Sequence, residues 1–183
     1  MSAVPRHLLT AAEFAALPRE GLRLELIRGE ISAMPPAFDD HGTITGGLTV
    51  LLGHYVLTSG LGRIYAAETG FLIAQNPDTV RAPDLAFIQA DRVPPPGAPG
   101  WVRVMPDLVA EVVSSGDRTT EVAEKVRMWL DADVRLVWIV YPTRRVIEVV
   151  RPGEPALVLH DGDQLDGYDV VPGFACPVGQ VFA

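Results

Sequence analysis

The sequence predicts an α/β (α+β) domain, a mixed central β-sheet flanked by helices. The chain has 183 residues, of which 48% are hydrophobic, which suits one domain with a substantial core. Short apolar runs alternate with segments of helical periodicity. The order strand, helix, buried strand at 107–113, 119–132 and 135–141 favours a right-handed crossover with parallel pairing. We therefore expect a single domain over residues 1–183 and one mixed sheet.

The N-terminal part predicts a short helix followed by a β-hairpin. Thr10 and Glu13 have the spacing of a capping box, and a helix over 11–17 would stop at Pro18. The hairpin follows from the alternation in LRLELI, a two-residue turn and a returning strand, at 22–27, Arg28-Gly29 and 30–34.

A long helix is expected from about 41 to 58, after the break at Pro35-Pro36 and before Gly60. Its apolar side chains fall on one stripe at helical spacing: Ile44, Leu48, Leu51, Leu52 and Tyr55. Three strands should follow, with the sequences RIYAAE, TGFLIA and TVRAPDLAFI, and then a loop at 93–100.

The second half predicts the buried strands of the sheet. The expected elements are strand 107–113, helix 119–132, strands 135–141 and 145–151, and strand-like pieces near 156–159 and 168–171. Within the first of these strands, alternation places Leu108, Ala110 and Val112 on one face and Val109 and Glu111 on the other.

Charge and cysteine content limit the function classes. The formal net charge is −8, which counts against a tight grip on a nucleic-acid backbone. The single cysteine, Cys176, excludes an internal disulfide, and we interpret it as structural. No run has the 18 apolar residues of a membrane span, and the N-terminus lacks a signal-peptide core. We therefore expect a cytoplasmic protein that does not bind membranes.

Three strands carry a carboxylate where an apolar residue is expected, namely Glu25, Asp84 and Glu111. Acids that converge at one place repel and require a compensating cation, and oxygen-rich sites suit Mg²⁺ or Mn²⁺. Lys125 borders the apolar stripe of the helix that follows the Glu111 strand, so its ammonium group can reach toward the sheet. This set predicts metal-assisted hydrolysis of a phosphodiester, with the lysine acting near the attacking water.

Each residue also has a simpler interpretation. Asp84 follows Pro83 and could end a turn, Glu111 could pair with Arg127, and Glu25 alternates with Arg23 as on a solvated hairpin face. Lys125 alone is typical of a surface helix. Ser114-Ser115-Gly116 more simply caps the next helix than forms a nucleophile site, because no histidine and aspartate pair is poised with it.

These pieces resemble the Uma-two family (domain of unknown function 820), restriction-endonuclease-like proteins of the PD-(D/E)xK nuclease superfamily. The matching stretches, from about residue 9 to 151, are LELIRGEISAMPP, His41, VRAPDLAFI, MPDLVAEVVSSGDRTTEVAEKVRMWLDADVRLVWIVYP and RRVIEVVRPG.

The resemblance implies a nuclease-type core with a divalent metal, Mg²⁺ or Mn²⁺, and DNA as the partner. Pro83-Asp84 matches the family's PD, and Glu111 matches the acid of the following core strand, so Asp84 and Glu111 are the expected metal ligands. Lys125 matches a lysine that this family carries on the helix, since Val113 occupies its usual place. Glu25 matches an early glutamate followed by glycine four residues later.

Other positions in the resemblance are less direct. His41 matches a common family histidine and is an accessory candidate; a local hydrogen bond at a helix start is the alternative. Pro106-Asp107 looks like a second PD but aligns with the approach to the Glu111 strand, so Asp107 is not assigned. Trp129 and Tyr141-Pro142 depart from the family pattern, and we expect neither to contact the ligands.

Two other functions remain open. A regulatory or interaction module, a homodimer on the same scaffold, could use exposed apolar tail residues such as Phe174 and Phe182. The other is a metal-dependent hydrolase of another small phosphorylated substrate.

Overall fold

The computed structural model describes residues 7–18, 21–97 and 99–183. Its strands are β1 (Arg23–Ile27), β2 (Glu30–Met34), β3 (Gly62–Ala66), β4 (Phe71–Ala74), β5 (Thr79–Arg81), β6 (Leu85–Gln89), β7 (Leu108–Val112), β8 (Leu136–Tyr141), β9 (Val146–Val150), β10 (Leu157–Leu159), β11 (Gln164–Asp166) and β12 (Ala175–Pro177). Its helices are α1 (Ala11–Ala16), α2 (Asp39–Ser59), α3 (Thr119–Asp131) and α4 (Val178–Val181), with a 3₁₀ turn η1 (Ala90–Arg92).

A six-stranded sheet forms the centre of the fold, in the order β10-β9-β8-β7-β6-β3. Within this sheet, over the described residues, β7 and β8 are the one parallel pair, with Glu111 opposite Ile139, and α3 makes the crossover between them. The parallel pairing predicted from the order of elements is therefore confirmed.

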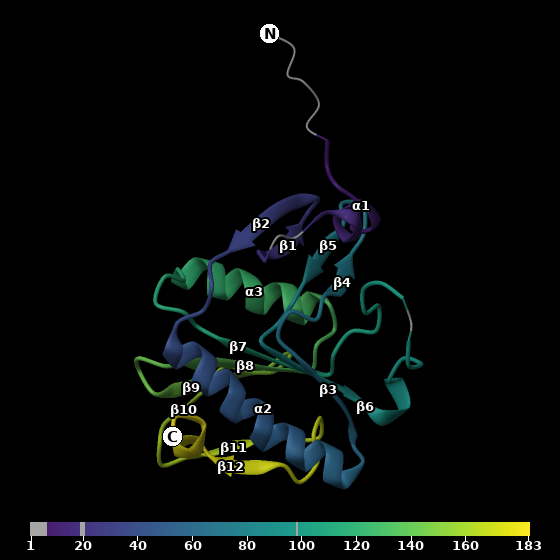
Figure 1. Ribbon diagram of the computed structural model, residues 1–183. Helices are drawn as coiled ribbons and strands as arrows, with labels where there is room; N and C mark the ends of the chain where they lie inside the picture. The colour runs from purple at the N-terminus through teal and green to yellow at the C-terminus, as the bar shows by residue number, and fades with distance from the viewer. Residues whose placement is uncertain (1–6, 19–20, 98) are drawn as a thin grey trace.

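Helices α2 and α3 cover opposite faces of this sheet (Figure 1). Leu48 and Leu52 of α2 pack in one core cluster with Leu108, Ala110 and Val112 of β7. Val122 and Trp129 of α3 pack in a second cluster with Val109 and Ile139. The alternation predicted for β7 is thus confirmed, and Glu111 belongs to the face covered by α3.

The expectation of one sheet is wrong, because the predicted strand TVRAPDLAFI is two strands. Its first part, β5, joins a separate four-stranded sheet in the order β2-β1-β5-β4, and its second part, β6, joins the six-stranded sheet. Between them lies Ala82-Pro83-Asp84, where proline supplies no backbone N–H for a ladder. The chain therefore passes from one sheet to the other at Asp84.

The predicted N-terminal helix and hairpin are confirmed. Thr10 and Glu13 form the capping box of α1. The β1–β2 turn has φ of 51° at Arg28 and 79° at Gly29, the left-handed pair that a tight two-residue hairpin turn requires. A Cβ atom on Gly29 would lie 2.7 Å from Leu8 Cβ, so the turn also packs closely under the preceding segment.

The C-terminal tail differs from the prediction. The strand expected near 168–171 is a turn, and β11 and β12 form a small two-stranded sheet instead. Phe174 is buried in the core and Phe182 packs against it, so the expectation that they are exposed for a dimer contact is wrong. Cys176 is buried, as expected for a structural thiol.

Within the described ranges, no helix has both the length and the apolar character needed to cross a bilayer.

Candidate active site

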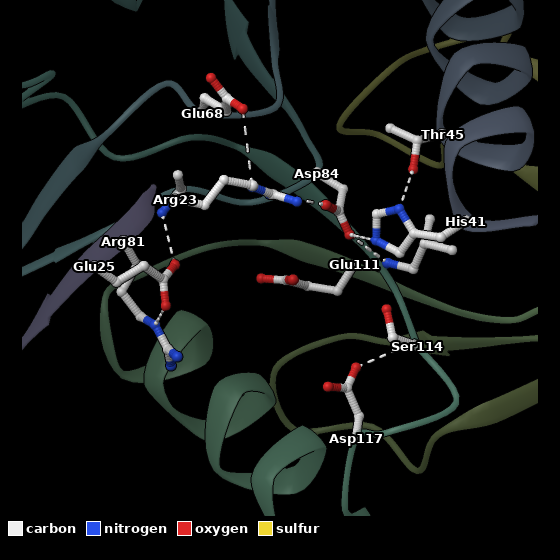
Figure 2. Close-up of polar contacts among 12 residues, drawn as sticks. Arg23, Glu25, His41, Thr45, Glu68, Arg81, Asp84, Glu111, Ser114 and Asp117 are labelled. Atoms are coloured by element: carbon white, nitrogen blue, oxygen red, sulfur yellow. Dashed lines mark hydrogen bonds and ion pairs between the residues drawn. The ribbon is translucent and has the colours of Figure 1, made fainter. Parts of the chain in front are cut away.

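A pocket of about 220 Å³ lies between the segment after β2, the start of α2, the end of β7 and α3. Four of the predicted site residues line it, namely His41, Asp84, Glu111 and Lys125. They come from four different parts of the chain, so the fold brings together side chains that the sequence separates by up to 84 positions (125 − 41). Figure 2 shows Asp84, Glu111 and His41 gathered around this space.

Asp84 is held by contacts on both of its oxygens. Oδ2 accepts a hydrogen bond from the Val112 backbone N–H at 2.8 Å and lies 3.2 Å from His41 Nε2. Oδ1 lies 3.7 Å from Arg23 Nη2. Burial opposes ionisation of Asp84, but the hydrogen bond and charge of His41, with the Val112 N–H, outweigh it and hold its pKa below the ordinary value. Asp84 is therefore a carboxylate at neutral pH.

His41 lies in the first turn of α2 and is buried. Its hydrogen bond to Asp84 raises its pKa against the opposing effect of burial. Its other ring nitrogen, Nδ1, lies 3.5 Å from Thr45 Oγ1 one helical turn later. His41 is thus part of the carboxylate site and does more than start a helix.

Glu111 makes two side-chain contacts with α3. Its Oε1 accepts a hydrogen bond from Trp129 Nε1 at 2.8 Å, and its Oε2 lies 3.3 Å from Lys125 Nζ. Burial raises the pKa of Glu111 although the Lys125 charge lowers it, and the Glu111 charge raises the pKa of Lys125. The buried carboxyl group therefore favours a further cation beside it.

Two expectations about α3 are corrected by these contacts. Trp129 does contact a proposed ligand, because its indole N–H donates to Glu111 Oε1. This departure from the family pattern therefore supplies a hydrogen-bond donor to the candidate site. The alternative pairing of Glu111 with Arg127 is not seen in the described part of the chain, where the Glu111 carboxyl group contacts Lys125 Nζ and Trp129 Nε1.

Glu25 is buried outside the pocket lining, so the solvated-face interpretation is wrong. Its carboxylate accepts hydrogen bonds from Arg81 Nε at 2.9 Å and from the Ala82 backbone N–H at 3.0 Å. Figure 2 shows it beside Arg81. Since Ala82 begins the passage between the two sheets, Glu25 fixes the chain just before Asp84.

Asp107 lies immediately before β7, four residues from Glu111 and away from the pocket. It is fully buried, accepts a hydrogen bond from the Gln89 N–H at 2.9 Å, and pairs with Arg92 and with Arg135. These contacts join β7 to the end of β6. Asp107 of the Pro106-Asp107 motif therefore has a structural role, as the buried acid of two ion pairs.

The loop after β7 also differs from expectation. Ser114-Ser115-Gly116 does not cap α3, whose N-cap is Arg118. The Ser114 N–H donates to Asp117 Oδ2 at 2.9 Å, and Ser114, Gly116 and Asp117 line the pocket. The loop is therefore a wall of the candidate site.

Arg23 and Phe38 also line the pocket, and sequence reasoning missed both as site residues. A signal for Arg23 was present, because it shares a strand face with Glu25 in LRLELI. Phe38 follows Pro35-Pro36, and its position relative to the acids could not be obtained without the fold.

A divalent metal suits this pocket in one particular way. In residues 7–18, 21–97 and 99–183, no three His, Cys, Asp or Glu side chains form a ready ligand cluster. Asp84 and Glu111 nevertheless share the pocket, and Mg²⁺ is commonly held by one or two carboxylates with water and substrate phosphate completing its shell. The residues fit that mode and not a complete all-protein cage.

A sequence profile of the Uma2 (Uma-two) family, described as "Putative restriction endonuclease", matches residues 11–179. The chain belongs to the Uma2 family. The family assignment extends the resemblance through the tail, including β11, β12 and the first half of α4.

A solved Uma2-type fold confirms the architecture. The crystal structure of "a putative nuclease belonging to DUF820" from Anabaena variabilis ATCC 29413 superposes with a TM-score of 0.84 at 19% identity. The match covers 95% of this chain and 97% of that one, so the nuclease-like fold is shared over almost the full length. No curated protein matches the chain.

Proposed function

We propose that this Uma2-family protein hydrolyses phosphodiester bonds of DNA with the help of Mg²⁺ or Mn²⁺. The observation that carries the proposal is the convergence of Asp84 and Glu111 on one pocket with Lys125 Nζ 3.3 Å from Glu111. Two buried acids and a lysine at a common cavity are costly for stability and are typical of a catalytic site.

Asp84 and Glu111 would hold the ion. When bound, it would polarise the scissile phosphate and lower the pKa of a water. Lys125 is half-buried and charged, so it would orient the attacking water and stabilise the negative charge that develops on the phosphate. His41 keeps Asp84 ionised and oriented, and Glu25 positions the chain before Asp84.

The first experiment measures metal binding independently of cleavage. Thermal unfolding is followed while Mn²⁺ or Mg²⁺ is added, and a ligand at 100 times its Kd should stabilise the native state by about 2.7 kcal/mol. Asp84→Ala and Glu111→Ala should abolish this increase. Asp107→Asn is the matched control, since it changes a buried acid next to the same strand and should retain the metal-linked stabilisation. A wild type with no metal-linked stabilisation would refute the metal site.

The second experiment measures cleavage of single-stranded, nicked and duplex DNA. Lys125→Ala should lose turnover by at least about 10²-fold while the metal-linked thermal shift survives. Retained turnover in this variant would remove the lysine from the mechanism.

The outer surface of α2 favours a second candidate function, a homodimeric interaction module, in place of catalysis. Val50 and Leu57 are exposed on its outer surface, and no Asp, Glu, Lys or Arg occurs from His41 to Ser59. A molecule of net charge −8 meets another copy with least repulsion through such a surface. Light scattering tests this: Leu57→Glu should convert a dimer to monomer, and a monomeric wild type contradicts the proposal.

A further inference from the structure

The pocket has an apolar wall that metal-dependent hydrolysis alone does not explain. Residues 34–38 line it with Met34, Pro35, Pro36, Ala37 and Phe38. Phe38 is 68% exposed, and among the large hydrophobic side chains exposed in the described part of the chain it is the only aromatic one. It is the N-cap residue of α2, and Ala37 separates it from Pro35-Pro36. A flat, solvent-facing ring therefore stands at the edge of a pocket lined by charged groups.

Arg23 supplies a cation at the same pocket. Its guanidinium lies 3.7 Å from Asp84 Oδ1 and 4.0 Å from Glu68 Oε1, and both distances exceed that of a normal N–H···O hydrogen bond. Figure 2 shows Arg23 between these two acids. Arg23 also lines a second cavity of about 210 Å³ with Glu68 and Leu22, so its side chain borders both cavities. A cation bound by Asp84 would leave this guanidinium available for a phosphate.

The charge of the molecule limits which nucleic acid suits this arrangement. A continuous duplex is gripped by many basic side chains along its phosphates, and a net charge of −8 disfavours that mode. An unpaired strand is bound differently, because its bases expose flat faces that stack on aromatic side chains with little sequence preference. One aromatic ring and one arginine match a single unpaired nucleotide.

We propose that the pocket accepts an unpaired nucleotide, as in a single strand or a frayed end, with its base stacked on Phe38 and a phosphate on Arg23. This inference rests on the proposed phosphodiester hydrolysis and names the substrate class of the same site.

Binding is measured by fluorescence anisotropy in the Lys125→Ala background with Mg²⁺, using a short labelled single strand and the same sequence as a blunt duplex. Phe38→Ala should weaken single-strand binding about 5- to 150-fold and leave duplex binding nearly unchanged. Phe38→Trp should restore the affinity, and Phe38→Leu should not, because a leucine offers no flat face. Leu157→Ala is the matched control: Leu157 is 48% exposed on β10, outside the pocket, and its loss should change neither affinity.

The arginine contact is tested by salt dependence. Arg23→Gln should reduce the slope of log K against log salt by about 0.7 for the single strand, the value of one phosphate contact. Arg144→Gln, at an exposed position in the β8–β9 turn, should leave the slope as it is.

Two results separate this inference from the proposed function. A protein that cleaves DNA with Mg²⁺ but binds single strands equally well as wild type and as Phe38→Ala overturns the inference and leaves the function standing. A protein that binds single strands through Phe38 but shows neither metal-linked stabilisation nor cleavage supports the nucleotide site and overturns the function. Equal dependence of duplex and single-strand binding on Phe38 also overturns the inference.

Discussion

The two carboxyl groups of the pocket are prepared differently by their neighbours. Asp84 receives a backbone N–H and a histidine, which favour its ionised form. Glu111 is more strongly affected by burial, which raises its pKa although Lys125 is close. At residue scale, burial therefore works against the ionised form of Glu111, whereas the contacts of Asp84 outweigh it.

The Trp129 indole should contribute to stability through its hydrogen bond to Glu111. Trp129→Phe keeps an aromatic ring in the core but removes the N–H that Glu111 accepts at 2.8 Å. We expect a loss of about 1–3 kcal/mol in the free energy of unfolding, because a buried carboxyl oxygen loses its donor. Urea unfolding of this variant, alone and combined with Glu111→Gln, gives the coupling energy. Strictly additive losses would show that the indole does not act through Glu111.

Asp107 should behave as a structural acid. Asp107→Asn retains an acceptor for the Gln89 N–H but weakens the pairs with Arg92 and Arg135. Both arginine side chains are more than a third exposed, so solvent screening limits the expected loss to about 1–2 kcal/mol. Denaturant unfolding measures this loss, and a variant that also lost metal binding would place Asp107 in the site.

At the scale of elements, the hairpin turn shows how a glycine combines two requirements. Gly29 and Gly153 both have a left-handed φ that an alanine would have to adopt. In Gly29→Ala the new Cβ would also lie 2.7 Å from Leu8 Cβ, whereas in Gly153→Ala nothing lies within 4 Å of it. We expect Gly153→Ala to cost about 1–2 kcal/mol and Gly29→Ala to cost distinctly more. Thermal unfolding compares them directly; equal losses would mean that the segment at Leu8 moves away without penalty.

Most elements could be predicted because their apolar periodicity is local. The α2 stripe, the capping box at Thr10 and the alternation of β7 all follow from spacing that a sequence displays directly. Pro83 marks a break within TVRAPDLAFI, but only the pairing partners show that β5 and β6 join different sheets. The contact of Trp129 with Glu111 was missed for the same reason, since it depends on how α3 lies over the sheet.

At the scale of the whole molecule, the tail closes the core. Phe174 was predicted to be an exposed apolar residue of the tail, yet it packs against Trp138 with ring centroids 5.8 Å apart. An apolar residue in a loop-like segment gives no local sign of which surface covers it. Asp84, Glu111 and Lys125, which residue type, order and the family resemblance indicated, do line one pocket.

Cys176 provides a measure of how firmly the tail is closed. Burial raises the pKa of its thiol to about 11, so almost no thiolate exists at pH 7–8. We expect the native protein to react with Ellman's reagent at least about 100-fold more slowly than the protein in denaturant, because the tail must open first. Rapid reaction at native conditions would show that β11 and β12 separate from the core easily.

The hydrogen bond from the Val112 N–H to Asp84 Oδ2 has one more consequence. Beside the β6–β7 ladder, the Asp84 carboxylate takes the place of a backbone carbonyl as the acceptor for the Val112 N–H. An ion that binds Asp84 must change the electron density felt by that amide. The ¹⁵N resonance of Val112 should therefore shift when Mg²⁺ is added, and an unchanged resonance would place the ion elsewhere. The amide resonance of Val112 in β7 thus reports directly on ion binding at Asp84.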